Sequence, residues 1–151
     1  MYEILIVGGG PAGLTAAIYA ARAGKHVAVL ERGSTGGQII SAPLVENYPG
    51  IPSVSGTELA RQMTEQACTF GAEIVYTEAV GLEKTLAGFR VLCMDGVREA
   101  KAVILATGAA HRSLGLAAED ALTGCGVSYC VVCDGAFYEG LDVAVVGGGD
   151  T

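Results

Sequence analysis

Cys130 and Cys133 are separated by two residues, a spacing that can close a disulfide or supply two ligands to a metal. With Cys125, the pattern matches three of the four positions of a plant-type iron–sulfur motif, but no cysteine follows to supply the fourth thiolate. A structural zinc site needs two more ligands, and the sequence has no second CxxC and no HxxxH. Both metal sites therefore remain weaker interpretations than a redox dithiol, and we expect no metal.

The redox interpretation also fits the neighbours of the two thiols. Val131 and Val132 cannot bind a metal, and we expect a helix to begin after Cys133, whose dipole would lower a thiol pKa. Asp134 could deliver or accept a proton. The chain has five cysteines, an odd number, and no secretion signal, which argues against a framework of structural disulfides.

A glycine-rich loop near the amino terminus has the features of a dinucleotide-binding site. The apolar run Tyr2–Val7 predicts a strand, Leu14–Ala23 a helix, and His26–Leu30 a second strand ending at Glu31. Between the first strand and the helix, Gly8 permits a tight turn, Gly10 lets the backbone approach a pyrophosphate, and Gly13 lets helix and strand pack closely. The Glu31 carboxylate can accept hydrogen bonds from a ribose.

A second such loop is indicated at the other end of the chain. Leu141–Val146 predicts a strand, and Gly147–Gly149 begins a second phosphate loop. A dithiol exchanges two electrons, and so does a flavin. The two loops and the CxxC pair together suggest a relay from nicotinamide to flavin to disulfide.

The remaining elements complete an α/β fold. We expect a long functional loop over Gly33–Pro52, then a helix capped at Ser55 that stops at Gly71. Its buried face would carry Leu59, Met63, Ala67 and Phe70. Cys68 and Cys93 are expected to be unreactive, buried or half-buried thiols, and His111 a solvated loop residue.

Further strands follow that helix. The expected strands are Ala72–Thr77, a three-stranded antiparallel meander of Val80–Lys84, Phe89–Met94 and Val97–Ala102, and a buried strand over Val103–Ala106. The meander would cover one side of a parallel sheet. The turn at Thr107-Gly108 follows the last strand at its carboxyl end, where open α/β sheets bind ligands.

Composition excludes some functions. A net charge of −7 provides no basic stripe for nucleic acid. No apolar run reaches the roughly 18 residues needed to cross a bilayer, and no signal peptide precedes the first strand, so we expect a cytoplasmic protein without a membrane segment.

Six motifs together resemble the low-molecular-weight, bacterial-type thioredoxin reductases of the pyridine nucleotide-disulfide oxidoreductase class. They are GGGPAG with Glu31, GGQI at 36–39, ENYPG at 46–50, ATGA at 106–109, GVSYCVVCDGAFY at 126–138 and VVGGGDT at 145–151. The resemblance runs in order along all 151 residues. It implies an FAD/NAD(P)-binding Rossmann-like fold, and FAD and NADPH as cofactors.

The resemblance also implies which residues contact the cofactors. Gly8, Gly10, Pro11, Ala12 and Gly13 would cradle the FAD pyrophosphate, and Glu31 would hold the adenosine ribose. Further FAD contacts are implied for Arg32, Gly37, Gln38, Asn47, Val80, Ala106, Thr107 and Gly108. Gly37, Gln38 and Asn47 would lie along the flavin half, Val80 would meet the adenine through its backbone, and Thr107-Gly108 would close over the cofactor. Gly147 and Gly149 would open the NADPH-binding domain.

The activity implied is that of a thioredoxin-disulfide reductase. Cys133 would be the thiol nearer the flavin, Cys130 would attack the disulfide of thioredoxin, and Asp134 would act as the general acid. Residues 1–112 would form the FAD domain, 113–125 a connector, and 126–151 the beginning of the NADPH domain. Family members are longer and form homodimers, so we expect this chain to be the amino-terminal part of one.

Two alternatives remain open at this point. The same relay serves a flavoprotein reductase that reduces alkyl hydroperoxide peroxidases. A noncatalytic flavin-binding fragment is the other possibility.

Overall fold

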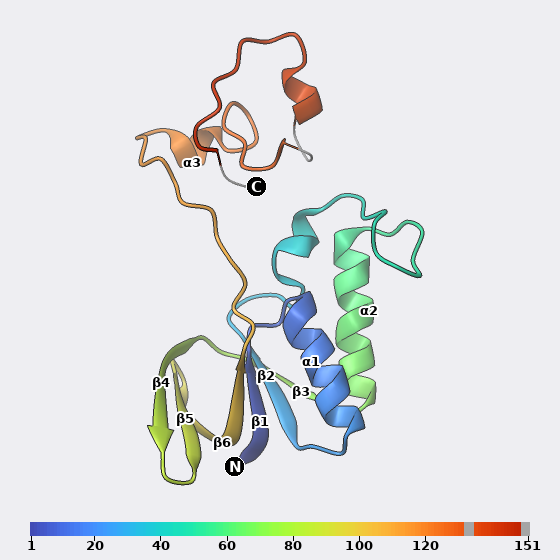
Figure 1. Ribbon diagram of the computed structural model, residues 1–151, viewed down its shortest axis with the longest axis vertical. Coiled ribbons are helices and arrows are strands. Elements are labelled where there is room, and N and C mark those ends of the chain that lie inside the picture. Colours follow the sequence, from blue (N-terminus) through green and yellow to red (C-terminus); the bar gives the residue numbers. More distant parts are fainter. Residues whose placement is uncertain (132–134, 149–151) are drawn as a thin grey trace. The chain divides into compact units, whose positions relative to one another are not determined.

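A computed structural model describes residues 1–131 and 135–148. The chain divides after Gly108 into two compact units, Met1–Gly108 and Ala109–Thr151. The first unit holds the sheet and its two long helices, and the second holds short helical turns and irregular chain (Figure 1).

The first unit is built on a six-stranded sheet in the order β3-β2-β1-β6-β5-β4. Its strands are β1 (Tyr2–Val7), β2 (Val27–Glu31), β3 (Glu73–Tyr76), β4 (Ala79–Thr85), β5 (Gly88–Cys93) and β6 (Gly96–Leu105). The first four in spatial order are parallel, and β5 and β4 extend the sheet as an antiparallel meander. The predicted α/β fold is therefore confirmed.

Two helices cover one face of the sheet, α1 (Pro11–Arg22) and α2 (Gly56–Thr69) (Figure 1). Leu14 of α1 and Leu59 of α2 are almost fully buried with Ile6 and Val29 from β1 and β2. α2 begins where the sequence predicts, whereas α1 begins at Pro11, three residues before the predicted start at Leu14. Pro11 occupies the first turn of α1, and the Ser55 hydroxyl accepts a hydrogen bond from the Glu58 N–H at the start of α2.

The meander folds over the opposite face, as predicted. Val91 and Cys93 of β5 and Ala100 of β6 form a second core with Leu5 and Leu30. Cys93 is accordingly buried, which confirms the sequence prediction for this thiol.

Two strands predicted over Val97–Ala102 and Val103–Ala106 are one continuous strand, β6. Its first half pairs with β5 and its second half with β1, and Ala100 pairs with both neighbours, so the backbone needs no break. The expected burial of the second half is wrong, because Ile104 and Leu105 are 37% and 65% exposed. The core under the helices is built on β1 and β2 and takes in no β6 residue.

The end of α2 also differs from the prediction. Phe70 follows the last turn of the helix and is 42% exposed, lying 5.5 Å below the Arg22 guanidinium instead of in the core. Cys68 is exposed and not buried or half-buried as predicted, since it is one position beyond the buried Ala67 and so lies off the buried face of α2.

The predicted loop Gly33–Pro52 is partly ordered by backbone contacts. It contains a 3₁₀ helix, η1 (Gly37–Ser41), and bridges that join Val45 to Val54 and Tyr48 to Ile51. Neither α1 nor α2, nor any other helix in the part of the chain described, combines the length and apolar character of a bilayer-spanning segment.

The second unit contains α3 (Glu119–Leu122) and η2 (Gly135–Tyr138). The strand predicted over Leu141–Val146 is wrong, because this segment is irregular and its apolar side chains are exposed. A strand requires neighbours for its N–H and C=O groups, and among the described residues of this unit no strand lies beside it.

Candidate functional site

The first glycine loop leaves no space for side chains at two positions. A Cβ on Gly13 would lie 1.9 Å from the Gly8 carbonyl oxygen, and a Cβ on Gly8 would lie 2.2 Å from that of Ala106. Gly8 also has a φ of +105°, a conformation that glycine adopts without strain. These two glycines let β1, α1 and the end of β6 approach within backbone contact.

Gly10 is different, because its surroundings are open. A Cβ there would have only ordinary contacts, the nearest 3.9 Å from the Cα of Gly37. Gly10 is the N-cap of α1, and within the described chain no side chain caps this end and no acidic residue lies in its first turn. The free N–H groups and positive dipole end of α1 therefore remain available to an anion such as a phosphate.

The Glu31 carboxylate lies at the end of β2 and connects two loops. One oxygen accepts a hydrogen bond from the Gly9 N–H at 2.7 Å, and the other accepts one from the Gly33 N–H at 2.9 Å. Each oxygen retains a second lone pair, so the carboxylate can also accept from a ligand hydroxyl. Arg32, the next residue, is exposed.

A second glycine turn, at Gly36-Gly37, packs against the first. The Gly36 N–H donates to the Gly9 carbonyl at 2.7 Å, and a Cβ on Gly37 would lie 3.3 Å from the Cα of Gly10. Both glycines have positive φ, and a Cβ on Gly36 would come within 2.5 Å of Ala60 of α2. The η1 segment that follows carries Gln38 on the surface.

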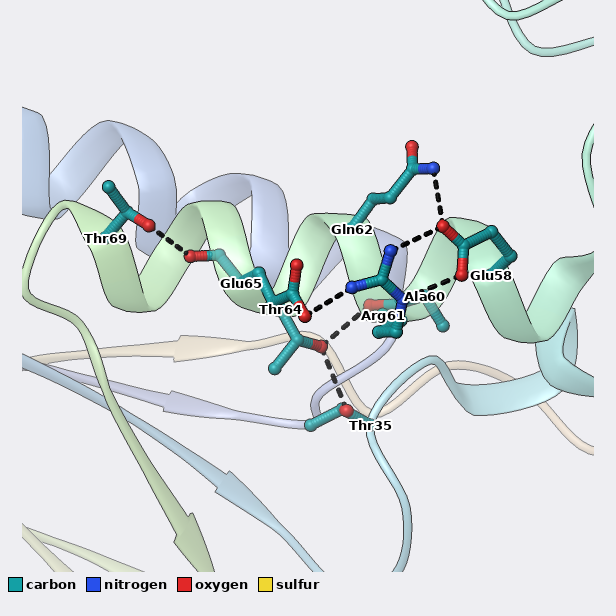
Figure 2. A network of polar contacts seen from close by, with 8 residues as sticks. All are labelled: Thr35, Glu58, Ala60, Arg61, Gln62, Thr64, Glu65 and Thr69. Atoms are coloured by element: carbon teal, nitrogen blue, oxygen red, sulfur yellow. Dashed lines mark hydrogen bonds and ion pairs between the residues drawn. The ribbon is translucent and has the colours of Figure 1, made fainter.

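Residues Thr35 and Thr64 fasten this turn to α2, a contact that the sequence analysis did not identify. Their hydroxyl oxygens are 2.9 Å apart, and the Thr64 hydroxyl is also hydrogen-bonded to the Ala60 carbonyl (Figure 2). On the same helix, Arg61 pairs with Glu58 and Glu65. The Arg61 guanidinium holds the pKa of Glu58 low, at about 2.

The other predicted cofactor residues lie just after β6, on β4 and on the loop after η1. Ala106 and Gly108 follow β6, where the Ala106 N–H donates to the Val7 carbonyl at 2.8 Å and Gly108 has a φ of +71°. Val80 is the extra residue of a β-bulge between Ala79 and Gly81, so its backbone falls outside the regular ladder. Asn47 is exposed on the loop between the two bridges.

The structure therefore joins Gly8–Gly13, Glu31, Gly36-Gly37 and Ala106 by direct contacts. Asn47 and Val80 are exposed. Ala12, Pro11 and Thr107 are part of the same loop and turn segments.

Cys130 of the second unit is disulfide-bonded. Cys125 of the same unit is a free thiol, as are Cys68 and Cys93 of the first unit. The predictions for Cys133, Asp134 and Gly149 concern positions outside the described residues. Gly147 is described and has a φ of +107°. Across the described ranges, no three His, Cys, Asp or Glu side chains form a group able to hold a metal ion.

One buried carboxylate in this unit was not predicted. Glu119 is 4% exposed, and its oxygens accept hydrogen bonds from the N–H groups of Leu114, Gly115 and Leu116 at 2.7, 2.7 and 3.1 Å. The Tyr129 hydroxyl also donates to it. The Tyr129 hydrogen bond and the backbone donors lower the pKa of Glu119 to about 2.

Tyr129 has a second partner in His111. The two rings are stacked with centroids 3.5 Å apart and an angle of 17° between their planes. His111 is exposed, as the sequence analysis expected, but it has this defined contact. A glycine-containing turn followed three to five residues later by an acidic residue is the only sequence signal that could have indicated the Glu119 site.

Comparison with known proteins gives the family. The model for pyridine nucleotide-disulphide oxidoreductases matches residues 2–151. The chain belongs to this family. The Rossmann-like fold class inferred from the motifs is confirmed by solved relatives, all with TM-scores well above 0.5.

Individual relatives carry a more specific name. Thioredoxin reductase from Listeria monocytogenes is 45% identical over 151 residues, which are 100% of this chain and 47% of that protein. Thioredoxin reductase from Bacillus subtilis is 45% identical over 155 residues, covering 100% of this chain and 48% of its own. The crystal structure of the Streptococcus pyogenes thioredoxin reductase matches with a TM-score of 0.79 and 48% identity over 91% of this chain and 45% of that one. The chain thus spans about half the length of the curated relatives it matches.

The hydrogen bond between Glu119 and Tyr129 predicts a change in the ionisation of the tyrosine. Because the Tyr129 hydroxyl donates to the Glu119 carboxylate, the pKa of Tyr129 is raised from 10.0 to about 12. We expect Glu119→Gln to return this pKa toward 10, since it removes the charged acceptor. NMR titration of selectively labelled tyrosine rings measures it. Asp120→Asn, a control that removes a neighbouring charge without touching the hydrogen bond, should leave most of the shift. A Tyr129 pKa that does not fall in Glu119→Gln contradicts the assignment.

Proposed function

We propose that this chain carries the FAD-binding and redox-dithiol parts of an NADPH-dependent thioredoxin-disulfide reductase. The observation that carries the proposal is the paired glycine turns, Gly8–Gly13 and Gly36-Gly37, packed at an uncapped helix end in a chain whose Cys130 is disulfide-bonded. The names and sequence identities of the relatives support it.

The residues of the first unit fit an FAD. The open space beside Gly10 and the uncapped amino terminus of α1 suit a pyrophosphate. Glu31 has acceptor capacity for a ribose, and the bulge at Val80 frees backbone groups for an adenine. We assign Arg32, Gly37, Gln38, Asn47, Ala106, Thr107 and Gly108 as the further FAD contacts. Gly147 and Gly149 are assigned to the start of the NADPH site.

When bound, the FAD would supply two-electron transfer from NADPH to the disulfide. The Cys130–Cys133 disulfide takes up two electrons and two protons and becomes a dithiol. The Cys130 thiolate then attacks the thioredoxin disulfide and forms a mixed disulfide between the two proteins. Cys133 attacks the Cys130 sulfur of this mixed disulfide, which re-forms the Cys130–Cys133 disulfide and releases thioredoxin as a dithiol. Asp134 holds and transfers the proton at the thiol pair. Cys133 is the thiol assigned to the flavin side.

The organisation proposed is an FAD domain over residues 1–112, a connector over 113–125, and the start of an NADPH domain over 126–151. The complete protein would act in the cytoplasm as a homodimer. Thioredoxin, or a similar small dithiol protein, is the proposed partner.

Two glycine substitutions test the FAD site. Gly10→Ala should weaken FAD binding at least about tenfold, because its Cβ occupies the open space, while the free protein loses at most about 1 kcal/mol of stability, since the Cβ fits and only the weaker N-cap preference of alanine is felt. Gly13→Ala is the matched comparison, and it should lower stability as well, because its Cβ meets backbone at 1.9 Å. Flavin fluorescence quenching and urea denaturation give the two readouts. Unchanged FAD affinity in Gly10→Ala would exclude this loop as the pyrophosphate site.

The cysteine roles are tested by thioredoxin-dependent NADPH oxidation in the complete protein. Cys130→Ser and Cys133→Ser should each reduce the rate to background, because either change removes the exchangeable disulfide. Cys68→Ser, a change at an exposed free thiol on α2, should retain the full rate. Substantial activity after Cys133→Ser would refute the assigned relay.

A further inference from the structure

Glu119 is a charged side chain in a place where charge is costly. It is 4% exposed, and burial of a carboxylate is tolerated only where hydrogen bonds replace its water. Three consecutive N–H groups, from Leu114 to Leu116, provide that replacement. The positive φ of Gly115, +77°, lets the turn curl around the carboxylate.

Hydrogen bonds to backbone carbonyls connect the turn around Glu119 to the residues that follow it. The Thr123 hydroxyl donates to the Glu119 carbonyl at 2.9 Å, and the N–H groups of Cys125 and Val127 both donate to the Leu122 carbonyl at 2.9 Å. Residues 114–127 are therefore joined to one another by hydrogen bonds within the segment. No part of the proposed relay uses the buried carboxylate itself.

Tyr129 connects this segment to the redox cysteine. Its hydroxyl donates to Glu119, its ring stacks on His111, and its backbone leads directly into Cys130. The Cys130 N–H in turn donates to the Ser128 hydroxyl at 3.2 Å. The backbone on the amino-terminal side of the disulfide is thus held at both Ser128 and Tyr129.

We propose that Glu119 and Tyr129 are positioning residues for Cys130, holding its backbone so that the disulfide is favoured over the dithiol. This inference rests on the proposed function of Cys130 in a redox pair. Both act through the backbone of residues 128–130, because Tyr129 is part of that backbone and Glu119 is joined to it by the Tyr129 hydrogen bond.

The physical basis is the entropy of ring closure. A cysteine whose backbone is already restrained loses less freedom when the S–S bond forms, so the effective concentration of one thiol at the other rises. Loosening Tyr129 removes part of this advantage. The disulfide then becomes easier to reduce, and its reduction potential becomes less negative.

Equilibration of the purified chain with mixtures of reduced and oxidised dithiothreitol tests the proposal. In this exchange the S–S bond of Cys130 breaks and one forms in dithiothreitol, with two electrons and two protons passing to the protein. Alkylation and mass spectrometry of the peptide that contains Cys130 count the thiols. For Tyr129→Phe we expect the equilibrium to move about tenfold toward the dithiol, or about 30 mV for a two-electron couple.

Glu119→Gln should shift the equilibrium in the same direction. The double variant should shift it no further than the larger single change, because Tyr129→Phe removes the same hydrogen bond that Glu119→Gln weakens by replacing its charged acceptor. If Glu119→Gln unfolds the second unit, Tyr129→Phe alone decides the case, since it removes a single oxygen atom. Far-UV circular dichroism verifies folding.

Two controls match the chemistry of these changes. Tyr138→Phe removes a phenolic oxygen from η2 in the same unit, and Asp120→Asn removes an exposed charge adjacent to Glu119. Both should leave the equilibrium unchanged. An unshifted equilibrium in Tyr129→Phe, or an equal shift in the controls, overturns the proposal.

The dithiothreitol exchange uses no FAD, NADPH or thioredoxin, so its outcome is separate from that of the proposed function. A shifted equilibrium in a protein that fails to reduce thioredoxin supports the positioning role and refutes the reductase. If the protein reduces thioredoxin and the equilibrium is unshifted in Tyr129→Phe, the reductase function is supported and the positioning role is refuted.

Discussion

The close approach of three backbone segments at Gly8 and Gly13 is the constraint on which the first unit depends. Side chains at these positions would overlap carbonyl oxygens of Gly8 and Ala106 by more than 1 Å of ordinary contact distance, judged from separations of 1.9 and 2.2 Å. Glycine here lets α1 start directly above the ends of β1 and β6. The uncapped helix end, the Glu31 carboxylate and the Gly36-Gly37 turn then converge on one edge of the sheet, because each is hydrogen-bonded to this loop or packed on it. The proposed FAD site is a consequence of this packing.

Strand β6 positions one side of the proposed FAD site, because it pairs with both the parallel and the antiparallel part of the sheet. β6 pairs antiparallel with β5 and parallel with β1, and so delivers Ala106–Gly108 beside Gly8 while the meander covers the opposite face. The bulge at Val80 belongs to the same meander. Two cores, one under the helices and one under the meander, hold the parallel strands from both sides. The second unit relies on polar contacts to a greater extent, with Glu119 as the buried centre of its turn.

Local signals in the sequence predicted most of the first unit. Glycine spacing, the Ser55 cap and the Asp95-Gly96 turn each act over a few residues, so the glycine loop, α2 and the meander could be read directly. Burial was harder to predict, because it depends on what packs against a side chain. Phe70 follows the helical period but lies past the helix end, and Leu141–Val146 is apolar enough for a strand but has no strand beside it in the described residues. The Glu119–Tyr129 contact joins residues ten positions apart in irregular chain, so no helix or strand periodicity in the sequence indicates it. The roles of Cys133, Asp134 and Gly149 remain predictions from sequence.

The central claim is that the paired glycine turns of this chain bind FAD. Backbone amide NMR of the isotopically labelled chain during FAD addition tests it most directly, because each glycine reports separately. We predict that the largest shifts occur at Gly8–Gly13, Gly36–Gln38 and Thr107-Gly108, at a midpoint shared by all three segments. Shifts confined to other residues, or no shifts at saturating FAD, would contradict the account.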